Sequence, residues 1–86
     1  MKYEYISYDV WGNDEDGYEV NQAFHTGEYV DIDPYLSDND LLNQLTEKGF
    51  ITESVDYDEV RIDGEPEYSL YFEYKGRPEF ELRPVS

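Results

Sequence analysis

The first third of the chain alternates between apolar and polar residues with a period of two. Residues 2–11 are rich in Tyr, Ile and Val. Residues 18–26 place Tyr18, Val20 and Phe24 on one side of an extended chain and polar side chains on the other. A period of two in residues of this kind is typical of a half-buried β-strand. Both segments are therefore predicted to be strands.

Two glycines enclose the polar segment that separates these strands. Residues 13–16, of sequence NDED, lie between Gly12 and Gly17. Clusters of Asn, Asp and Gly favour turns, so the two strands are predicted to form a β-hairpin with a loop longer than the two-residue minimum. Residues 28–33 either extend the second strand or form a short separate one, and Pro34 ends it.

A helix is predicted over residues 37–48. Ser37 can cap its N-terminus, and Asp40, three residues later, completes an Asp variant of the capping box. Gly49 can adopt the left-handed conformation that ends a helix, after which Phe50 folds back on the last turn. The apolar stripe that would cover a sheet consists of Leu41, Leu42 and Leu45.

The last third of the chain alternates in the same way and predicts a three-stranded antiparallel meander. Turns are expected at residues 63–64 and 75–78, and Pro84 is expected to end the last strand, at the edge of the sheet. The whole chain is then a single α+β domain over residues 1–86, in ββ-α-βββ order, with the helix packed on a mostly antiparallel sheet. The apolar positions of the meander are Val60, Ile62, Tyr68, Leu70, Phe72, Tyr74, Phe80 and Leu82.

Acidic residues dominate the composition, with 22 Asp and Glu against 6 Lys and Arg and a formal net charge of −16. High charge with low hydrophobicity is typical of disordered chains. The 10 Tyr, 4 Phe and 1 Trp are the aromatic residues that such chains lack, so a folded domain is expected. The chain shows no signal-peptide h-region and no run approaching the ~18 apolar residues of a membrane span. Residence in the cytoplasm is predicted, with no membrane partner.

Residues that carry catalysis or bind metals are scarce. Cys is absent and His25 is the only histidine, so the sequence contains no recognisable nucleophilic triad. An EF-hand alignment on Gly17 places Gly12 at the first ligand position and Ala23 at the twelfth, where the motif requires acidic residues. A facing pair of carboxylates would suit glycoside hydrolysis, but 86 residues leave little room for a sugar cleft. We therefore predict a non-enzymatic protein with no cofactor and no metal.

The charge distribution also argues against direct binding of nucleic acid. From residue 3 to residue 47 the chain contains 12 acidic residues and no Lys or Arg. Proteins that stack bases on aromatic side chains combine them with a basic groove. The tyrosines are therefore assigned to the core or to a protein interface. We expect Tyr8, Tyr18, Tyr68 and Tyr74 in the core, and Tyr3, Tyr5 and Tyr71 on the surface.

The acidic residues themselves are the best candidates for a function. Alternate residues of a strand share a face at a spacing of about 6.5–7 Å, so Glu79 and Glu81 are predicted to lie side by side in a lattice of carboxylates. Duplex DNA carries a phosphate every ~3.4 Å along each strand, and a protein that holds phosphates with Lys and Arg would be attracted to either surface. The predicted partner is a basic, DNA-binding protein. The predicted binding residues are Asp14, Glu15, Asp16, Glu19, Glu28, Asp31, Asp33, Glu59, Glu67, Glu73, Glu79 and Glu81.

A second interpretation stays open, because a large net charge also keeps a small protein soluble. Solubility alone needs a net charge of only about 2–8. In this alternative the protein is an accessory or structural interaction module, a monomer or a homodimer, whose interface is apolar and centres on Trp11 and Tyr71. Crowding of the carboxylates further predicts that their pKa values are raised in the folded state, so that stability increases as pH falls from 7.

Three stretches of the chain carry a family resemblance: YDVWGNDEDGYEVNQAFHTGE at 8–28, LLNQLTEKGFI at 41–51 and YSLYFEYKGRPEFELR at 68–83. They resemble small acidic proteins of tailed phages and prophages, most specifically in the pattern D-V-W-G-N-x-x-D-G-Y-E-V-N. These proteins have no established activity, so the resemblance assigns no site residue. It implies a phage product in the cytoplasm of a bacterial host. Small acidic phage proteins often look like inhibitors of host DNA-binding machinery, including restriction, CRISPR and repair enzymes.

Overall fold

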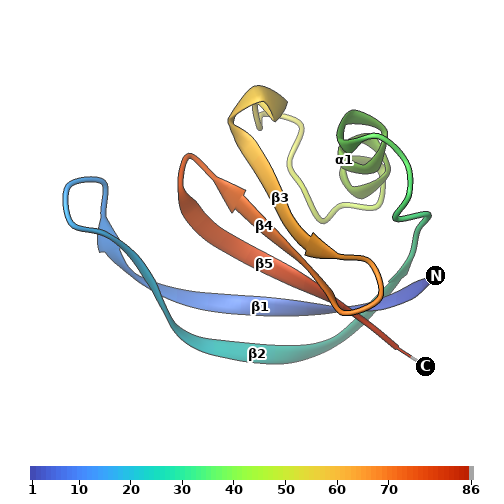
Figure 1. The fold of residues 1–86 in the computed structure, drawn as a ribbon, viewed down its shortest axis with the longest axis horizontal. Helices are drawn as coiled ribbons and strands as arrows, with labels where there is room; N and C mark the ends of the chain where they lie inside the picture. Colours follow the sequence, from blue (N-terminus) through green and yellow to red (C-terminus); the bar gives the residue numbers. More distant parts are fainter. Residues whose placement is uncertain (86) are drawn as a thin grey trace.

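The computed structural model describes residues 1–85. Five strands form one antiparallel sheet, and one α-helix lies beside it (Figure 1). The predicted α+β class and the ββ-α-βββ order are confirmed. No helix among the described residues is long and apolar enough to cross a membrane. The elements are β1 (Lys2–Asn13), β2 (Gly17–Asp31), α1 (Asp38–Glu47), the short 3-10 helix η1 (Tyr57–Glu59), β3 (Val60–Glu65), β4 (Ser69–Tyr74) and β5 (Arg77–Pro84).

The sheet joins the N-terminal hairpin to the C-terminal meander through the last strand. Its strand order is β2-β1-β5-β4-β3, so β5 lies at the centre and the edges are β2 and β3. The prediction that the last strand is an edge strand is wrong, because β1 adds to the side of β5 that the meander leaves open. Pro78 fits in this central strand because β1 pairs only with residues 80–84, which leaves Pro78 a neighbour on one side alone.

Helix α1 begins and ends as the sequence predicts. The hydroxyl of Ser37 accepts a hydrogen bond from the backbone N–H of Asp40 at 3.3 Å. At the C-terminus the N–H of Phe50 donates to the carbonyl of Leu45 at 2.9 Å, and the N–H of Gly49 donates to the carbonyl of Thr46 at 3.1 Å. These two bonds form a Schellman ending.

The core lies between α1 and one face of the sheet. Tyr3, predicted to be exposed, has 0% of its surface accessible, and its hydroxyl donates to the carbonyl of Pro66 at 2.8 Å. Tyr5 is half-buried between the rings of Phe50 and Phe80, with ring centroids 5.1 and 5.0 Å away. Both tyrosines lie inward because β1 is enclosed between β2 and β5. The buried cluster contains Tyr3, Val30, Ile32, Leu41, Leu42, Leu45, Leu70, Phe72, Phe80 and Leu82.

The outer half of the N-terminal hairpin is more exposed than its alternating pattern predicts. Beyond Ser7, β1 pairs only with β2, so this part is a two-stranded ribbon that projects past the other strands (Figure 1). Val20 is 39% exposed and Phe24 is 45% exposed, so the predicted half-buried face is wrong there. Tyr18 is partly buried. We call residues 8–24 the hairpin arm.

The turn between β3 and β4 lies later in the chain than predicted. Asp63 and Gly64 belong to β3, and residues 66–68 form the turn. Tyr68 is consequently 74% exposed and not part of the core, whereas Tyr8 and Tyr74 are partly buried. The turn between β4 and β5 is confirmed. Its two residues, Lys75 and Gly76, have φ values of 53° and 80°, as expected of a tight hairpin turn.

Candidate protein-binding surface

The acidic residues that the sequence singles out do not form one continuous lattice. Most of the 22 Asp and Glu are exposed, but the sheet distributes the predicted binding residues over separate places. The tip of the hairpin and the end of β2 lie at opposite ends of the β1–β2 ladder, whose pairs run from Asn13↔Gly17 to Lys2↔Asp31. The tip carries Asp14, Glu15, Asp16 and Glu19; the end near the N-terminus carries Asp31, Asp33 and Glu67; the β4–β5 turn region carries Glu59, Glu73 and Glu79; and Glu28 lies between them on β2.

Glu81 is not part of the surface. It is 4% exposed, on the face of the sheet that lacks the helix. Its carboxylate accepts hydrogen bonds from the Tyr8 hydroxyl at 2.8 Å, the Ser69 hydroxyl at 2.8 Å and Arg83 Nε at 3.0 Å. The expected pairing of Glu79 with Glu81 fails because the register shifts between Phe72 and Glu73, which makes Glu79 an extra residue in β5. Glu79 instead lines a pocket on the helix side.

Burial and hydrogen bonding act in opposite directions on the Glu81 carboxyl. Burial, the largest influence, raises its pKa, but the hydrogen bonds from Arg83, Ser69 and Tyr8 together outweigh burial and hold the pKa below its ordinary value. Burial and the bond to Glu81 raise the pKa of Tyr8 far above its ordinary value. Crowding therefore does not raise the pKa of this carboxyl, contrary to the prediction from composition.

The tip of the hairpin is ordered by its own polar side chains. The amide oxygen of Asn13 accepts hydrogen bonds from the backbone N–H groups of Glu15 and Asp16, at 2.9 and 2.8 Å. The hydroxyl of Tyr18 donates to the Asp14 carboxylate, and this bond is the main reason that the pKa of Tyr18 is raised. These bonds order the backbone of the turn and fix the position of the Asp14 carboxylate.

Trp11 is a large exposed aromatic side chain on the hairpin arm. The predicted set of acidic binding residues did not include it. It is the only tryptophan, 62% exposed, and it pairs directly across the strands with Glu19. A shallow recess beside it is lined by Trp11, Gly12, Asp16, Gly17, Tyr18 and Glu19. The signal in the sequence was an isolated Trp immediately before an acidic turn, in a segment without Lys or Arg.

At the end of the sheet near the N-terminus, the acids Asp31 and Glu67 contact other groups of the protein. The N-terminal ammonium lies 3.3 Å from Asp31, and Lys2 Nζ lies 4.9 Å from the centre of the Tyr29 ring. The Tyr35 hydroxyl donates to Glu67, and this bond holds the pKa of the Glu67 carboxyl below its ordinary value. At this end positive groups of the protein already neutralise part of the negative charge.

The arginines lie in the C-terminal meander, and each binds an acid two residues along the same strand. The ion pairs are Arg61–Asp63 at 3.2 Å, Arg77–Glu79 at 3.3 Å and Arg83–Glu81 at 3.0 Å. The first two pairs are exposed and contribute little to stability, typically less than ~1 kcal/mol, whereas in the third the carboxylate of Glu81 is buried. These arginines do change the distribution of charge. They neutralise acids of the meander, so most of the uncompensated negative charge lies on the N-terminal hairpin, the helix and the segment that follows the helix.

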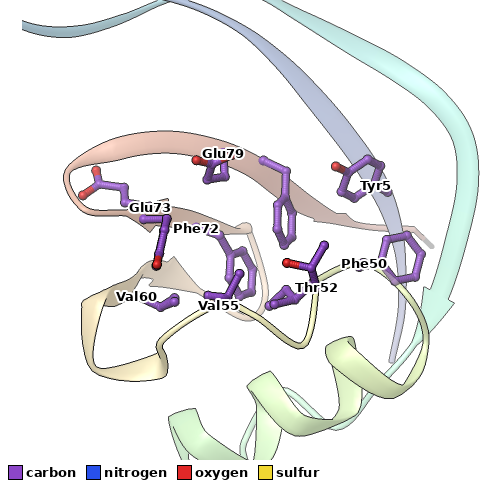
Figure 2. Close-up of a pocket in the computed structure, with 11 residues that line it drawn as sticks. Tyr5, Phe50, Thr52, Val55, Val60, Phe72, Glu73 and Glu79 are labelled. Carbon is purple, nitrogen blue, oxygen red and sulfur yellow. The ribbon is translucent and has the colours of Figure 1, made fainter. Parts of the chain in front are cut away.

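A partly open pocket of about 210 Å³ lies between the sheet and residues 50–55. Its floor is aromatic, with Phe72 and Phe80 stacked at 4.5 Å between ring centroids. Figure 2 shows Glu73 and Glu79 at one end and Tyr5 and Phe50 at the other. At the acidic end Arg77 forms an ion pair with Glu79. The pocket can hold a small apolar group, and the titratable side chains of its lining are Tyr5, Glu73, Tyr74 and Glu79.

Among residues 1–85 no group of three acidic or histidine side chains is arranged to hold a metal ion. His25 lies on the surface, with Nδ1 3.0 Å from Glu4.

Comparisons with known proteins do not identify a relative. No protein-family model, no curated protein and no solved structure matches the chain. The resemblance to acidic phage proteins therefore stays a prediction.

Proposed function

We propose that this protein is a non-enzymatic binding protein that occupies the basic surface of a DNA-binding protein by imitating DNA. Its partner would be of the restriction, CRISPR, repair or regulatory type, met in the cytoplasm of a bacterial host. The main contact is the hairpin arm, with Asp14, Glu15, Asp16 and Glu19 facing Lys and Arg residues of the partner. The acids at the other end of β2 provide a second contact.

One observation carries the proposal: the hairpin arm carries several acids, most of them at its tip, and has no Lys or Arg of its own. Residues 8–24 contain five acidic residues and no Lys or Arg. The arm extends past the other strands, so both of its faces are accessible. Asn13 holds the backbone of its tip in place, and the hydroxyl of Tyr18 holds the Asp14 carboxylate. A charged surface of this kind attracts an oppositely charged protein and accelerates its association.

The dimensions of the protein are compatible with DNA mimicry. Its longest extent is 36 Å, and one turn of B-DNA is about 34–36 Å long. The tip acids and the group of Asp31, Asp33 and Glu67 lie toward opposite ends of the β1–β2 ladder. A partner that contacts DNA phosphates one helical turn apart would therefore meet a cluster of carboxylates at each end of the β1–β2 ladder.

An apolar interface is the alternative, and the exposed aromatic residues favour it. Trp11 is 62% exposed and Phe24 is 45% exposed on the arm, and Tyr71 is 43% exposed on β4. Aromatic residues are enriched at protein interfaces. The two functions differ in their response to salt, because ion pairs between exposed charges weaken as salt increases, whereas apolar contacts do not.

The test is affinity capture from a bacterial lysate at low salt, with elution by a salt gradient and, separately, by duplex DNA. A partner that DNA displaces competitively supports mimicry and names the target. The variant D14N/E15Q/D16N removes three charges from the tip and should weaken capture strongly. The matched control E47Q/E53Q/E65Q removes three exposed charges elsewhere and should bind nearly as the wild type does.

Two results would contradict the proposal. Partners that resist both salt and DNA would show that the interface is apolar and that the acidity is incidental. Equal loss of binding in the tip variant and in its control would show that only the net charge matters and that the hairpin arm has no special role.

A further inference from the structure

We propose that the face of the hairpin arm around Trp11 is a docking site for an arginine side chain of the partner. The guanidinium would stack on the indole ring and donate hydrogen bonds to the carboxylates of Glu19 and Asp16. The inference rests on the proposed function, since it names the group that the acidic arm recognises. It adds a chemical preference that charge alone does not give.

The backbone brings the required groups together. Trp11 and Glu19 are directly opposite on β1 and β2, so their side chains leave the ribbon on the same face, with Cβ atoms about 4.5–5.5 Å apart. The residues beside them are Gly12 and Gly17, which have no side chains to fill the space next to the indole ring. Asp16 completes the lining of the recess.

The two glycines are fixed in this place by the backbone. Gly12 has a φ of 114°, and a Cβ at this position would lie 2.1 Å from the carbonyl oxygen of Gly17. A larger residue at position 12 would therefore force the strands apart. The close approach of the two strands beside the recess therefore depends on Gly12.

In the part of the chain that the structure describes, no Lys or Arg side chain lies over the Trp11 ring. Two tyrosine rings do have a cation beside them: Lys2 lies over Tyr29 at 4.9 Å, and Lys75 lies over Tyr74 at 5.4 Å. Around Trp11 the nearest basic residues in the sequence are Lys2 and Lys48. Arg77 acts to lower the pKa of Tyr18, but its guanidinium is bound to Glu79. Asp16 and Glu19 therefore give this site negative charge that a cation of a partner can neutralise.

Arginine suits these groups better than lysine does. Tryptophan is the strongest aromatic partner for a cation. A guanidinium is planar and weakly hydrated, so it can stack on the ring while its N–H groups bind carboxylates at its edge. An ammonium group can make the charge contact but cannot stack. For an exposed site the preference should be about two- to fivefold in Kd.

The experiment uses capped hexapeptides of arginine and of lysine, which have the same length and charge. Each peptide carries a fluorescent label, and anisotropy measures its total binding to the full chain at low salt. Because Trp11 is the only tryptophan, a parallel titration with unlabelled peptide reports on this site through indole fluorescence. We expect the arginine peptide to bind about two- to fivefold more tightly than the lysine peptide and to change the Trp11 emission more.

Two variants locate the preference. Trp11→Leu should bring both peptides to equal affinity while leaving salt-dependent binding, and its fold is checked by circular dichroism. Glu19→Gln should reduce the arginine preference, whereas the control Glu28→Gln removes one charge from the same strand and should keep it. The Glu19 comparison decides the question even if Trp11→Leu does not fold.

The outcomes separate this inference from the proposed function. Equal binding of the two peptides, with Glu19→Gln indistinguishable from Glu28→Gln, would overturn the arginine site and leave the acidic binding function intact. Binding of neither peptide at low salt would overturn both.

Discussion

Glu81 should be the most important charged residue for stability, although it was predicted to lie at the surface. It is 4% exposed and receives hydrogen bonds from Tyr8, Ser69 and Arg83. Glu81→Gln keeps the shape of the side chain but removes the charge and one acceptor oxygen, so that an amide N–H group faces donors. At least one of the three bonds is then lost.

The expected cost of Glu81→Gln is about 2 kcal/mol. A hydrogen bond to a charged group contributes roughly 1.5–3 kcal/mol. Removing one member of a fully buried ion pair costs roughly 3–5 kcal/mol, but the Arg83 side chain is 45% exposed, so water can solvate it after the change. We therefore take the lower range. In a domain of this size ~2 kcal/mol corresponds to a fall in Tm of roughly 8–16 °C.

The assay is urea and thermal unfolding at pH 7, followed by circular dichroism, with Glu79→Gln as the control. Glu79 lies two residues away on the same strand in an ion pair that is partly exposed on both sides, so its loss should cost less than ~1 kcal/mol. If Glu81→Gln stayed within ~0.5 kcal/mol of the wild type, the hydrogen bonds at Glu81 would be too weak to support the reasoning.

The pH dependence gives the same prediction a second test. The folded-state pKa of Glu81 is lowered, so its contribution is fully present above the unfolded pKa of about 4.3 and is lost as pH falls through the folded value. The difference in the free energy of unfolding between the wild type and Glu81→Gln should therefore shrink as the solution is acidified below pH ~4.3. A difference that grew on acidification would mean that the pKa is raised and not lowered.

Three further substitutions test the fold by urea unfolding at pH 7. Leu45→Ala removes a fully buried side chain of α1 and should cost roughly 2–5 kcal/mol, and Ser37→Ala removes the N-cap bond and should cost about 1 kcal/mol. Gly64→Ala should cost more than Gly76→Ala. Both glycines have positive φ, but only at Gly64 would the new Cβ lie 2.1 Å from a backbone oxygen, that of Ser69. Equal costs at the two glycines would show that the strands adjust freely.

The sequence predicts the features of this fold that depend on neighbouring residues. The helix is an example, because Ser37, Gly49 and the three leucines between them act within one turn or along one stripe. The Lys75–Gly76 turn is another. Hydrogen bonds at both helix ends and positive φ at both turn residues match the prediction.

The errors concern burial, which depends on which strands become neighbours. Tyr3 and Tyr68 occupy similar positions in alternating segments, yet one has 0% of its surface accessible and the other 74%. The difference arises because β1 joins β5 inside the sheet, whereas Tyr68 falls in a turn. Strand order is a property of the whole chain, and alternation alone does not contain it.

Only part of the candidate site was predicted, because the rest of it also depends on which strands become neighbours. Charge and turn composition identified Asp14, Glu15 and Asp16, which the structure places on an exposed, ordered tip. They did not separate these acids from Glu81, because a buried and an exposed carboxylate have the same sequence pattern. Trp11 was missed as part of the acidic site, since its pairing with Glu19 depends on the hairpin register.

The way the protein uses its bases argues that its acidity is more than a means to solubility. Arg61, Arg77 and Arg83 bind acids of the meander, and Lys2 and Lys75 lie over tyrosines. Little positive charge remains to balance the hairpin arm. A surface shaped only for solubility would mix both signs and keep large apolar side chains covered. The arm does neither, because it carries five acids and no Lys or Arg, and it exposes 62% of a tryptophan that lies beside Asp16 and Glu19. Charge and an aromatic ring left together on one projecting element suit a surface that binds a basic partner.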